Sequence, residues 1–216
     1  MDTIKAYRNV RVILIGGPSN AGKSNLAQCL ALRLGWQHAS TDQIQRARHP
    51  GRPWTDKGIL PKHVAEHYLA LSVDELFARV VHHYQNMWPG IASFITSYAT
   101  DPSADPLVLE GSALWPETVV TLNIDSVAAI WLKTSNKLLE DRILKASKFA
   151  EASDREKLMI QKFLGRAHRY NEYMMDMVKQ LGLRTIDVDA TSSVEELSSR
   201  CLQLIGYEDA NNGRDG

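Results

Sequence analysis

The sequence predicts an α/β protein built on a parallel sheet with helices on both faces. Short apolar runs rich in β-branched residues alternate with longer segments whose apolar residues recur at helical spacing. The first such run ends in two glycines and leads directly into a helix. One block of helical segments, at about residues 48–105, interrupts the alternation. We therefore expect one domain over residues 1–216, with this block as a helical insert between the second and third strands.

The first four elements follow the order strand, helix, strand, helix. Residues 10–15 (VRVILI) form an apolar run that predicts a buried strand. Residues 23–34 carry leucines at helical spacing and are closed by Gly35, which predicts a helix. A short strand is expected at 36–39, and a helix begins at 41–47. Ligands in parallel sheets bind beyond the carboxyl ends of the strands, so the loops that follow each strand are the places to look for a site.

The insert contains three predicted helices. Turn formers fill residues 49–54 (HPGRPW), and Pro61 is well suited to begin the first helix. Ser72 and Glu75 have the spacing of a capping box for the second helix. Pro89 is expected to end that helix at Trp88, because proline lacks the N–H group that a helix interior needs. The third helix then covers residues 90–99, followed by a loop at 101–106 (DPSADP).

The alternation resumes after the insert. We expect strands at 107–109, 127–132 and 184–188, and helices at 135–148, 154–181 and 194–205. The polar segment from Tyr207 is expected to be frayed.

A glycine-rich segment after the first strand matches the pattern G-x-x-x-x-G-K-[ST] of a phosphate-binding P-loop. Its residues are Gly17, Pro18, Ser19, Asn20, Ala21, Gly22, Lys23 and Ser24. Small residues let successive backbone N–H groups turn toward phosphate oxygens, and the following helix adds its positive N-terminal end. Lys23 is expected to reach the β- and γ-phosphates and Ser24 to ligate Mg²⁺. We count the next residue, Asn25, among the nucleotide contacts.

Asp42 follows the second strand, at the same rim of the sheet as the P-loop. A kinase needs a carboxylate that orients an acceptor hydroxyl and takes its proton, and Asp42 is the candidate. The alternative is that it only stabilises the first turn of the next helix. Arg46 lies one turn later on the same face, where it either holds an anionic part of the substrate or is a solvated helix residue.

Glu110 ends the third strand, as an acid does in a Walker-B arrangement. An acid here can hold the water shell of Mg²⁺ or help to activate the acceptor, and the alternative is a cap for the next helix. Gly111 indicates a close approach of the backbone to a ligand, although a plain turn also explains it.

The C-terminal half is rich in basic residues. Arg142, Arg166 and Arg169 are candidates for a lid that stabilises the transferred phosphoryl group. The alternative is a solvated helix face balanced by neighbouring acids. The segment 187–191 either lines an adenine pocket with its backbone or is an ordinary loop in which Thr191 or Ser192 caps the last helix.

The insert offers candidates for substrate contacts. Arg52 and Trp54 lie in the turn segment near the expected acceptor site and are predicted to bind the substrate. Tyr68, Tyr84 and Trp88 fit helical spacing and are expected in the core.

The bulk composition excludes several partners. The 25 basic and 25 acidic residues give no net charge, which argues against a nucleic-acid or membrane surface. Neither an apolar run of membrane-spanning length nor a signal-like N-terminus is present. The two cysteines fall in helical segments, which favours a reducing cytoplasm over a disulfide framework. We expect a cytoplasmic monomer or homodimer.

These motifs together resemble the P-loop small-molecule kinases, which include shikimate and gluconate kinases, chloramphenicol phosphotransferase and adenylate-kinase-like enzymes. The resemblance is carried by GPSNAGKS after VILIG, STD after the second strand and LVLEG at the third strand, and it spans about three-quarters of the chain. STD and EGSALWP are most similar to a 2-phosphoglycerate kinase type. The resemblance implies a three-layer sandwich with five parallel strands in the order 2-3-1-4-5, an acceptor near Asp42 and an adenine near Arg142. The long insert and the absence of a fixed arginine lid motif depart from the family.

The sequence thus predicts an ATP- and Mg²⁺-dependent kinase acting on a small hydroxylated or phosphorylated metabolite. One alternative is a P-loop ATPase or nucleotide switch without a small-molecule acceptor. A binding-only module and a polynucleotide kinase are the others, and the neutral charge disfavours the last.

Overall fold

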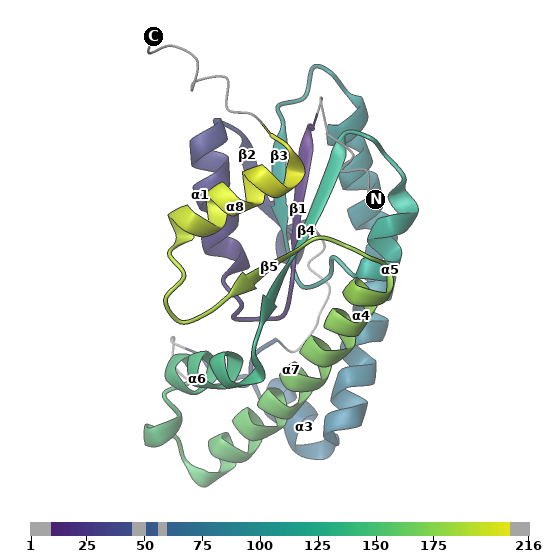
Figure 1. The fold of residues 1–216 in the computed structure, drawn as a ribbon. Helices are drawn as coiled ribbons and strands as arrows, with labels where there is room; N and C mark the ends of the chain where they lie inside the picture. The colour runs from purple at the N-terminus through teal and green to yellow at the C-terminus, as the bar shows by residue number, and fades with distance from the viewer. Residues whose placement is uncertain (1–9, 45–50, 56–59, 208–216) are drawn as a thin grey trace.

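The computed structural model describes residues 10–44, 51–55 and 60–207. Five parallel strands form one sheet in the order β2-β3-β1-β4-β5, which confirms the predicted fold class (Figure 1). The strands are β1 (Val12–Gly16), β2 (Gln37–Ser40), β3 (Leu107–Glu110), β4 (Val127–Thr134) and β5 (Thr185–Val188).

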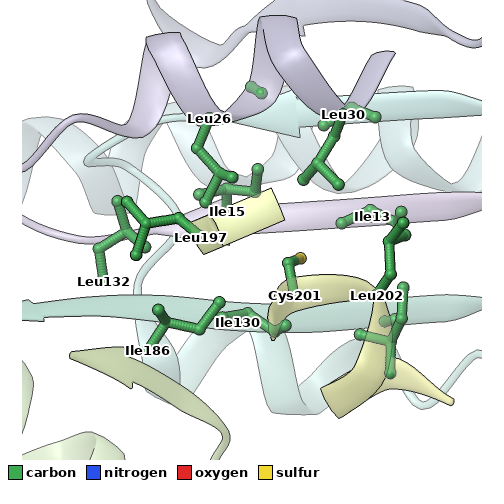
Figure 2. Packing of buried hydrophobic residues seen from close by; sticks show 14 of the residues in the cluster. Ile13, Ile15, Leu26, Leu30, Ile130, Leu132, Ile186, Leu197, Cys201 and Leu202 are labelled. Atoms are coloured by element: carbon green, nitrogen blue, oxygen red, sulfur yellow. The ribbon is translucent and has the colours of Figure 1, made fainter. Parts of the chain in front are cut away.

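Helices cover both faces of the sheet. Helices α1 (Lys23–Leu34) and α8 (Val194–Ile205) pack on one face, and α4 (Val73–Thr100) and α7 (Asp154–Gln180) cover the other. Side chains of β1 alternate between the two cores, as the period of a strand requires. Figure 2 shows the first core, where leucines of α1 and α8 meet Ile13 and Ile15 of β1. The burial of both faces explains why the central strand β1 is a continuous apolar run.

A second, helical body extends beyond the carboxyl ends of the strands (Figure 1). It consists of α3 (Lys62–Ala70), the start of α4, α6 (Asn136–Ala146) and the first half of α7, which share their own apolar core. Tyr68 and Phe163 are its largest fully buried side chains. This body lies next to the loops that follow the strands, so it can supply side chains to a site at that edge.

Helix α4 contradicts one prediction, because it runs without interruption through Pro89. A proline inside a helix costs roughly 3 kcal/mol. Three side chains that flank it, Met87, Ile91 and Ile95, are buried against the sheet in one continuous stripe. Their burial offsets the cost at about 1.5–3 kcal/mol for each apolar side chain. The predicted end of the helix at Trp88 is therefore wrong, whereas the capping box at Ser72 and Glu75 is confirmed.

The remaining elements agree with the predictions to within two residues at most ends. Three short elements were not predicted, namely α5 (Pro116–Val119) and the 3₁₀ turns Val120–Leu122 and Phe149–Glu151. The helix expected at 41–47 is described as α2 (Thr41–Ile44), and Arg46 lies outside the described residues. Most of the segment expected to fray after Tyr207 also lies outside them. No helix in the described part of the chain is both long and apolar enough to cross a membrane.

Candidate active site

A cavity of about 480 Å³ opens at the carboxyl edge of the sheet, on the side of the helical body. It gathers side chains from the P-loop, from the ends of β2 and β3, from the insert and from α6. The lining residues are Ser19, Asn20, Gly22, Lys23, Ser24, Asn25, Asp42, Arg52, Glu110, Gly111, Ser112 and Arg142. The fold thus brings together residues of five separate segments that the sequence analysis singled out independently.

The backbone of the P-loop adopts positive φ angles at residues that tolerate them. Gly17, Asn20 and Gly22 have φ angles of 138°, 64° and 103°. These lie in the left-handed region, where glycine is unstrained and asparagine is tolerated better than most residues. Gly22 precedes the first residue of α1, so the N-terminal end of a 12-residue helix faces the loop. Turned amide groups and a helix terminus together favour an anion at this point.

Lys23 is buried at the base of the cavity. Its Nζ donates hydrogen bonds to the Pro18 carbonyl oxygen at 2.8 Å and to Ser112 Oγ at 3.1 Å. Burial lowers the pKa of Lys23 from 10.5 to about 8, because desolvation disfavours the ammonium form. The carboxylates of Glu110 and Asp42 act in the opposite direction on this pKa, and Arg52 adds to the lowering. An anion that binds beside Lys23 is therefore expected to stabilise its ammonium form.

This lowered pKa predicts that triphosphate binding depends on pH. Below about pH 8 the free protein already carries the Lys23 proton, whereas above it a proton must be taken up on binding. The dissociation constant for a nucleoside triphosphate should therefore rise about tenfold between pH 7 and pH 9, measured by calorimetry. Lys23→Arg, whose side chain stays protonated, should flatten the profile. A wild-type affinity that is constant over this range would contradict the prediction.

Ser24 and Glu110 approach each other across the cavity floor. Ser24 Oγ donates a hydrogen bond to Glu110 Oε1 at 3.2 Å. The two meet because β3 pairs with β1 in a register that sets Glu110 beside Ile15, just before the P-loop. A hydroxyl and a carboxylate oxygen at this separation fit Mg²⁺, which accepts one or two protein oxygens and completes its shell with water and phosphate oxygens. In the described part of the chain, no group of three or more His, Cys, Asp or Glu side chains offers another metal site.

Asp42 lies in the first turn of α2 and lines the cavity. Its backbone N–H is 3.4 Å from Ser40 Oγ, while its carboxylate has no hydrogen bond or ion pair among the described residues. The carboxylate thus makes no capping hydrogen bond within the described residues, but an acid in the first turn of α2 also stabilises that helix through its dipole, so both interpretations of Asp42 stay open. Among the described residues, no hydrogen bond or ion pair keeps the Asp42 carboxylate from a ligand in the polar cavity, and its charge acts to raise the pKa of Lys23 and of His83.

Gly111 is explained by a close approach between the ends of β2 and β3. A Cβ atom at this position would lie 1.8 Å from Thr41 Oγ1 and 2.7 Å from Thr41 Cβ. Thr41 is fully buried and immediately precedes Asp42, so it cannot move aside without shifting the candidate base. The glycine is therefore required by packing against protein, and it also lines the cavity.

Gly111→Ala is accordingly expected to destabilise the protein by about 1–3 kcal/mol through overpacking, seen as a lower Tm in thermal unfolding. Adding Thr41→Ala removes the Oγ1 and Cγ2 atoms that the new methyl group would meet, so it should restore part of the loss. An unchanged Tm for Gly111→Ala would show that the strand ends can separate freely.

Two arginines line the cavity, one from the insert and one from α6. Arg142 of α6 donates from Nη1 to the carbonyl oxygens of Asn20 and Ala21 at 3.1 and 2.9 Å, which fastens α6 to the P-loop. Arg52 places its guanidinium 5.8 Å from the centre of the Trp54 ring. No carboxylate pairs with Arg52 in the part of the chain that the structure describes. Arg52 is thus a cation at the cavity for which the described residues supply no counter-ion.

Trp54 itself is not among the lining residues. Its ring packs edge-on against Phe163 at a centroid distance of 4.8 Å. Of the two residues predicted to contact a substrate from this segment, the structure brings only Arg52 to the cavity.

Arg166 and Arg169 do not line the cavity either. Arg166 is buried in the helical body, where Nη1 donates to Tyr68 Oη at 3.2 Å. Arg169 forms an exposed ion pair with Asp74 at the start of α4. Both side chains belong to the contact of α7 with α3 and α4, as does Lys162, whose Nζ donates to two carbonyl oxygens at the end of α3. Their predicted contact with phosphate remains a prediction.

The sequence analysis missed Ser112, which lies between the phosphate side of the cavity and the helices. Its Oγ accepts a hydrogen bond from Lys23, and its carbonyl oxygen accepts one from Tyr170 of α7. The available signal was its position directly after Glu110 and Gly111 at the end of a buried strand. Trp131 supports the same loop through a 3.1 Å hydrogen bond from Nε1 to the Leu114 carbonyl oxygen.

A second cavity of about 520 Å³ lies beside the first turns of α6, at the ends of β4 and β5. Its lining includes residues 187–190, part of the segment for which two readings were open. Within that segment Asp189 accepts hydrogen bonds from the N–H groups of Thr191 and Ser192. The cap of α8 is Ser193, not Thr191 or Ser192 as expected. The segment is thus a tight turn that also borders a cavity.

Comparison with solved structures places this fold among known ones. A shikimate kinase from Acinetobacter baumannii in complex with shikimate matches with a TM-score of 0.51 and 15% identity over 99% of this chain and 100% of that one. A gluconokinase from Sinorhizobium meliloti 1021 matches with a TM-score of 0.50 and 18% identity over 92% and 93%. A shikimate kinase from Bacteroides thetaiotaomicron gives 0.50 and 15% over 90% and 97%. No family model matches the chain, and no curated protein matches its sequence. The chain has the fold of the P-loop small-molecule kinases.

Proposed function

We propose that the protein is a kinase that transfers the γ-phosphoryl group of ATP to a small hydroxylated or phosphorylated metabolite. The observation that carries this proposal is that one cavity joins two differently equipped halves. The P-loop, Lys23 and the Ser24–Glu110 pair form a phosphate-binding half. Asp42 and Arg52 form the other half, where a carboxylate and a cation lie without protein partners in the described part of the chain.

In the phosphate-binding half, the backbone N–H groups of residues 19–25 would surround the phosphates and Lys23 would neutralise the β- and γ-oxygens. Ser24 and Glu110 would hold Mg²⁺, directly or through water, and the ion supplies further charge neutralisation when it is bound. Arg142, which donates hydrogen bonds to two carbonyl oxygens of the P-loop, would lie near the adenine. The adenine itself would occupy the second cavity, at the ends of β4 and β5.

In the acceptor half, Asp42 would orient the acceptor hydroxyl and receive its proton as the oxygen attacks the γ-phosphorus. The new bond joins the acceptor oxygen to phosphorus, and the bond between the γ-phosphorus and the bridging oxygen of ADP breaks. Arg52 would hold an anionic group of the acceptor, and Gly111, which lines the same cavity, would present its backbone to the acceptor. Trp54 would act through its contact with Arg52, and Arg46 stays a candidate outside the described residues.

The experiment is to incubate the protein with ATP, Mg²⁺ and pooled hydroxylated and phosphorylated metabolites, and to follow the reaction by phosphorus NMR. A new phosphate ester that appears together with ADP supports the kinase and identifies its acceptor. Release of orthophosphate alone, unchanged by every pool, would favour the ATPase or nucleotide switch. Binding of ATP with no turnover in any pool would leave a binding module.

A further inference from the structure

The segment 51–55 carries Arg52 to the cavity, yet it belongs to no helix or strand. A loop without tertiary contacts would leave the charge of Arg52 without a defined position, so the contacts of the segment decide where Arg52 lies. The described contacts of the segment converge on two buried side chains of the helical body, Tyr68 of α3 and Phe163 of α7.

Tyr68 ties the segment to α3 by a single hydroxyl group. Its Oη donates a hydrogen bond to the Gly51 carbonyl oxygen, directly before Arg52. The same Oη accepts a hydrogen bond of 3.2 Å from Arg166 Nη1. Tyr68 is fully buried, so water does not compete for either bond. A donor that itself accepts from a cation is polarised, which strengthens the bond that it gives.

Arg166 is held beneath this hydroxyl by aromatic contacts. Its guanidinium carbon lies 4.5 Å from the centre of the Phe163 ring and 5.9 Å from that of Tyr68. Phe163 also receives the edge of Trp54, so the two ends of the segment meet the same small cluster. In the described chain no carboxylate pairs with Arg166, although it is only 7% exposed. A buried cation that finds no counter-ion among the described residues is costly there, which indicates a role beyond packing.

Lys162 anchors the base of this arrangement one helical turn before Arg166. Its Nζ donates to the carbonyl oxygens of Leu69 and Leu71, at 3.0 and 2.8 Å, where α3 ends. The same face of α7 thus fixes both Tyr68 and the end of the helix that carries it.

We propose that Tyr68 and Arg166 are positioning residues for Arg52. The chain of hydrogen bonds from Arg166 through Tyr68 to Gly51 holds the segment 51–55 so that the Arg52 charge is presented to the acceptor half of the cavity. The two residues thereby set the affinity of that half for the anionic group of its ligand. This inference rests on the proposed function only in taking the ligand at Arg52 to be the acceptor.

Tyr68→Phe tests the proposal, because it removes the hydroxyl and keeps the ring that packs in the core. The indole NMR signal of Trp54, assigned by its loss in Trp54→Phe, reports on the segment. Sulfate serves as the anion probe, titrated in the presence of Mg²⁺ and AMP-PNP so that triphosphate fills the P-loop. We expect sulfate to shift the Trp54 signal in the wild type, and Tyr68→Phe to raise the sulfate midpoint about tenfold.

Tyr98→Phe is the matched control, since its hydroxyl makes only a 3.4 Å contact with Gln37 at the surface, and it should leave the midpoint unchanged. A positioning role also predicts non-additivity. Arg52→Ala should abolish the sulfate response, and Tyr68→Phe should add nothing to it. Equal midpoints in the wild type and Tyr68→Phe, or no sulfate response in the wild type, would overturn the proposal. The titration needs no turnover, so it is decided separately from the kinase activity.

Discussion

Lys23→Met is expected to lower kcat for phosphoryl transfer by about 10²–10³-fold, the loss that follows removal of one preorganised charge or donor at a reacting centre. Methionine matches the length and volume of the lysine stem, so the buried pocket at the base of the cavity stays filled. The substitution removes the ammonium group. In the structure this group donates hydrogen bonds to Pro18 and Ser112, and with a nucleotide bound it can donate to phosphate oxygens instead.

The size of this effect follows from burial. Charge interactions in a site that excludes water are worth several times more than at a surface, and Lys23 is only 7% exposed. Lys62→Met is the matched control, because Lys62 forms an exposed i,i+4 pair with Glu66 that contributes little. A Lys23→Met protein that transfers phosphate at a near wild-type rate would show that the P-loop amides alone suffice, and it would remove Lys23 from the mechanism.

The parts of the site that depend on local chemistry could be predicted from the sequence. The P-loop is such a part, since its glycines, its lysine and the helix after it are neighbours in the chain. The capping box at Ser72 has the same local character. Asp42 and Glu110 could be placed at one rim because the carboxyl ends of parallel strands share an edge of the sheet. Their positions around the cavity agree with that reasoning.

The parts that depend on tertiary packing could not be predicted. Proline usually ends a helix, but at Pro89 the burial of the flanking side chains against the sheet outweighs this local preference. Arg166 and Arg169 have the charge and the position along the chain of lid residues, but α7 turns them toward α3 and α4, and no sequence pattern gives that rotation. Ser112 acts through contacts with Lys23 and Tyr170, from elements distant in the chain. Gly111 carried a correct signal of close approach, but its partner proved to be Thr41 and not a ligand.

Asp42→Asn is the second substitution with a large expected effect. Asparagine keeps the shape and the hydrogen-bonding reach of the side chain and loses the ability to accept a proton as a base. We expect kcat to fall by about 10²–10⁴-fold, the usual contribution of a positioned general base, while nucleotide affinity measured by calorimetry stays within about twofold. Measuring kcat and nucleotide affinity together separates the role of Asp42 from that of Lys23, because substitution of Lys23 should lower both.

Asp105→Asn provides the control, because Asp105 lies at the opposite end of β3, where among the described residues it bonds the exposed Gln37 side chain alone. If Asp42 instead served the P-loop half, its loss would change nucleotide affinity by well over twofold. If it served only to begin α2, it would change Tm and leave kcat intact. A large fall in kcat with unchanged affinity and Tm is the one combination that requires a base acting on an acceptor. It would also exclude a simple ATPase in which no acceptor hydroxyl has to be deprotonated.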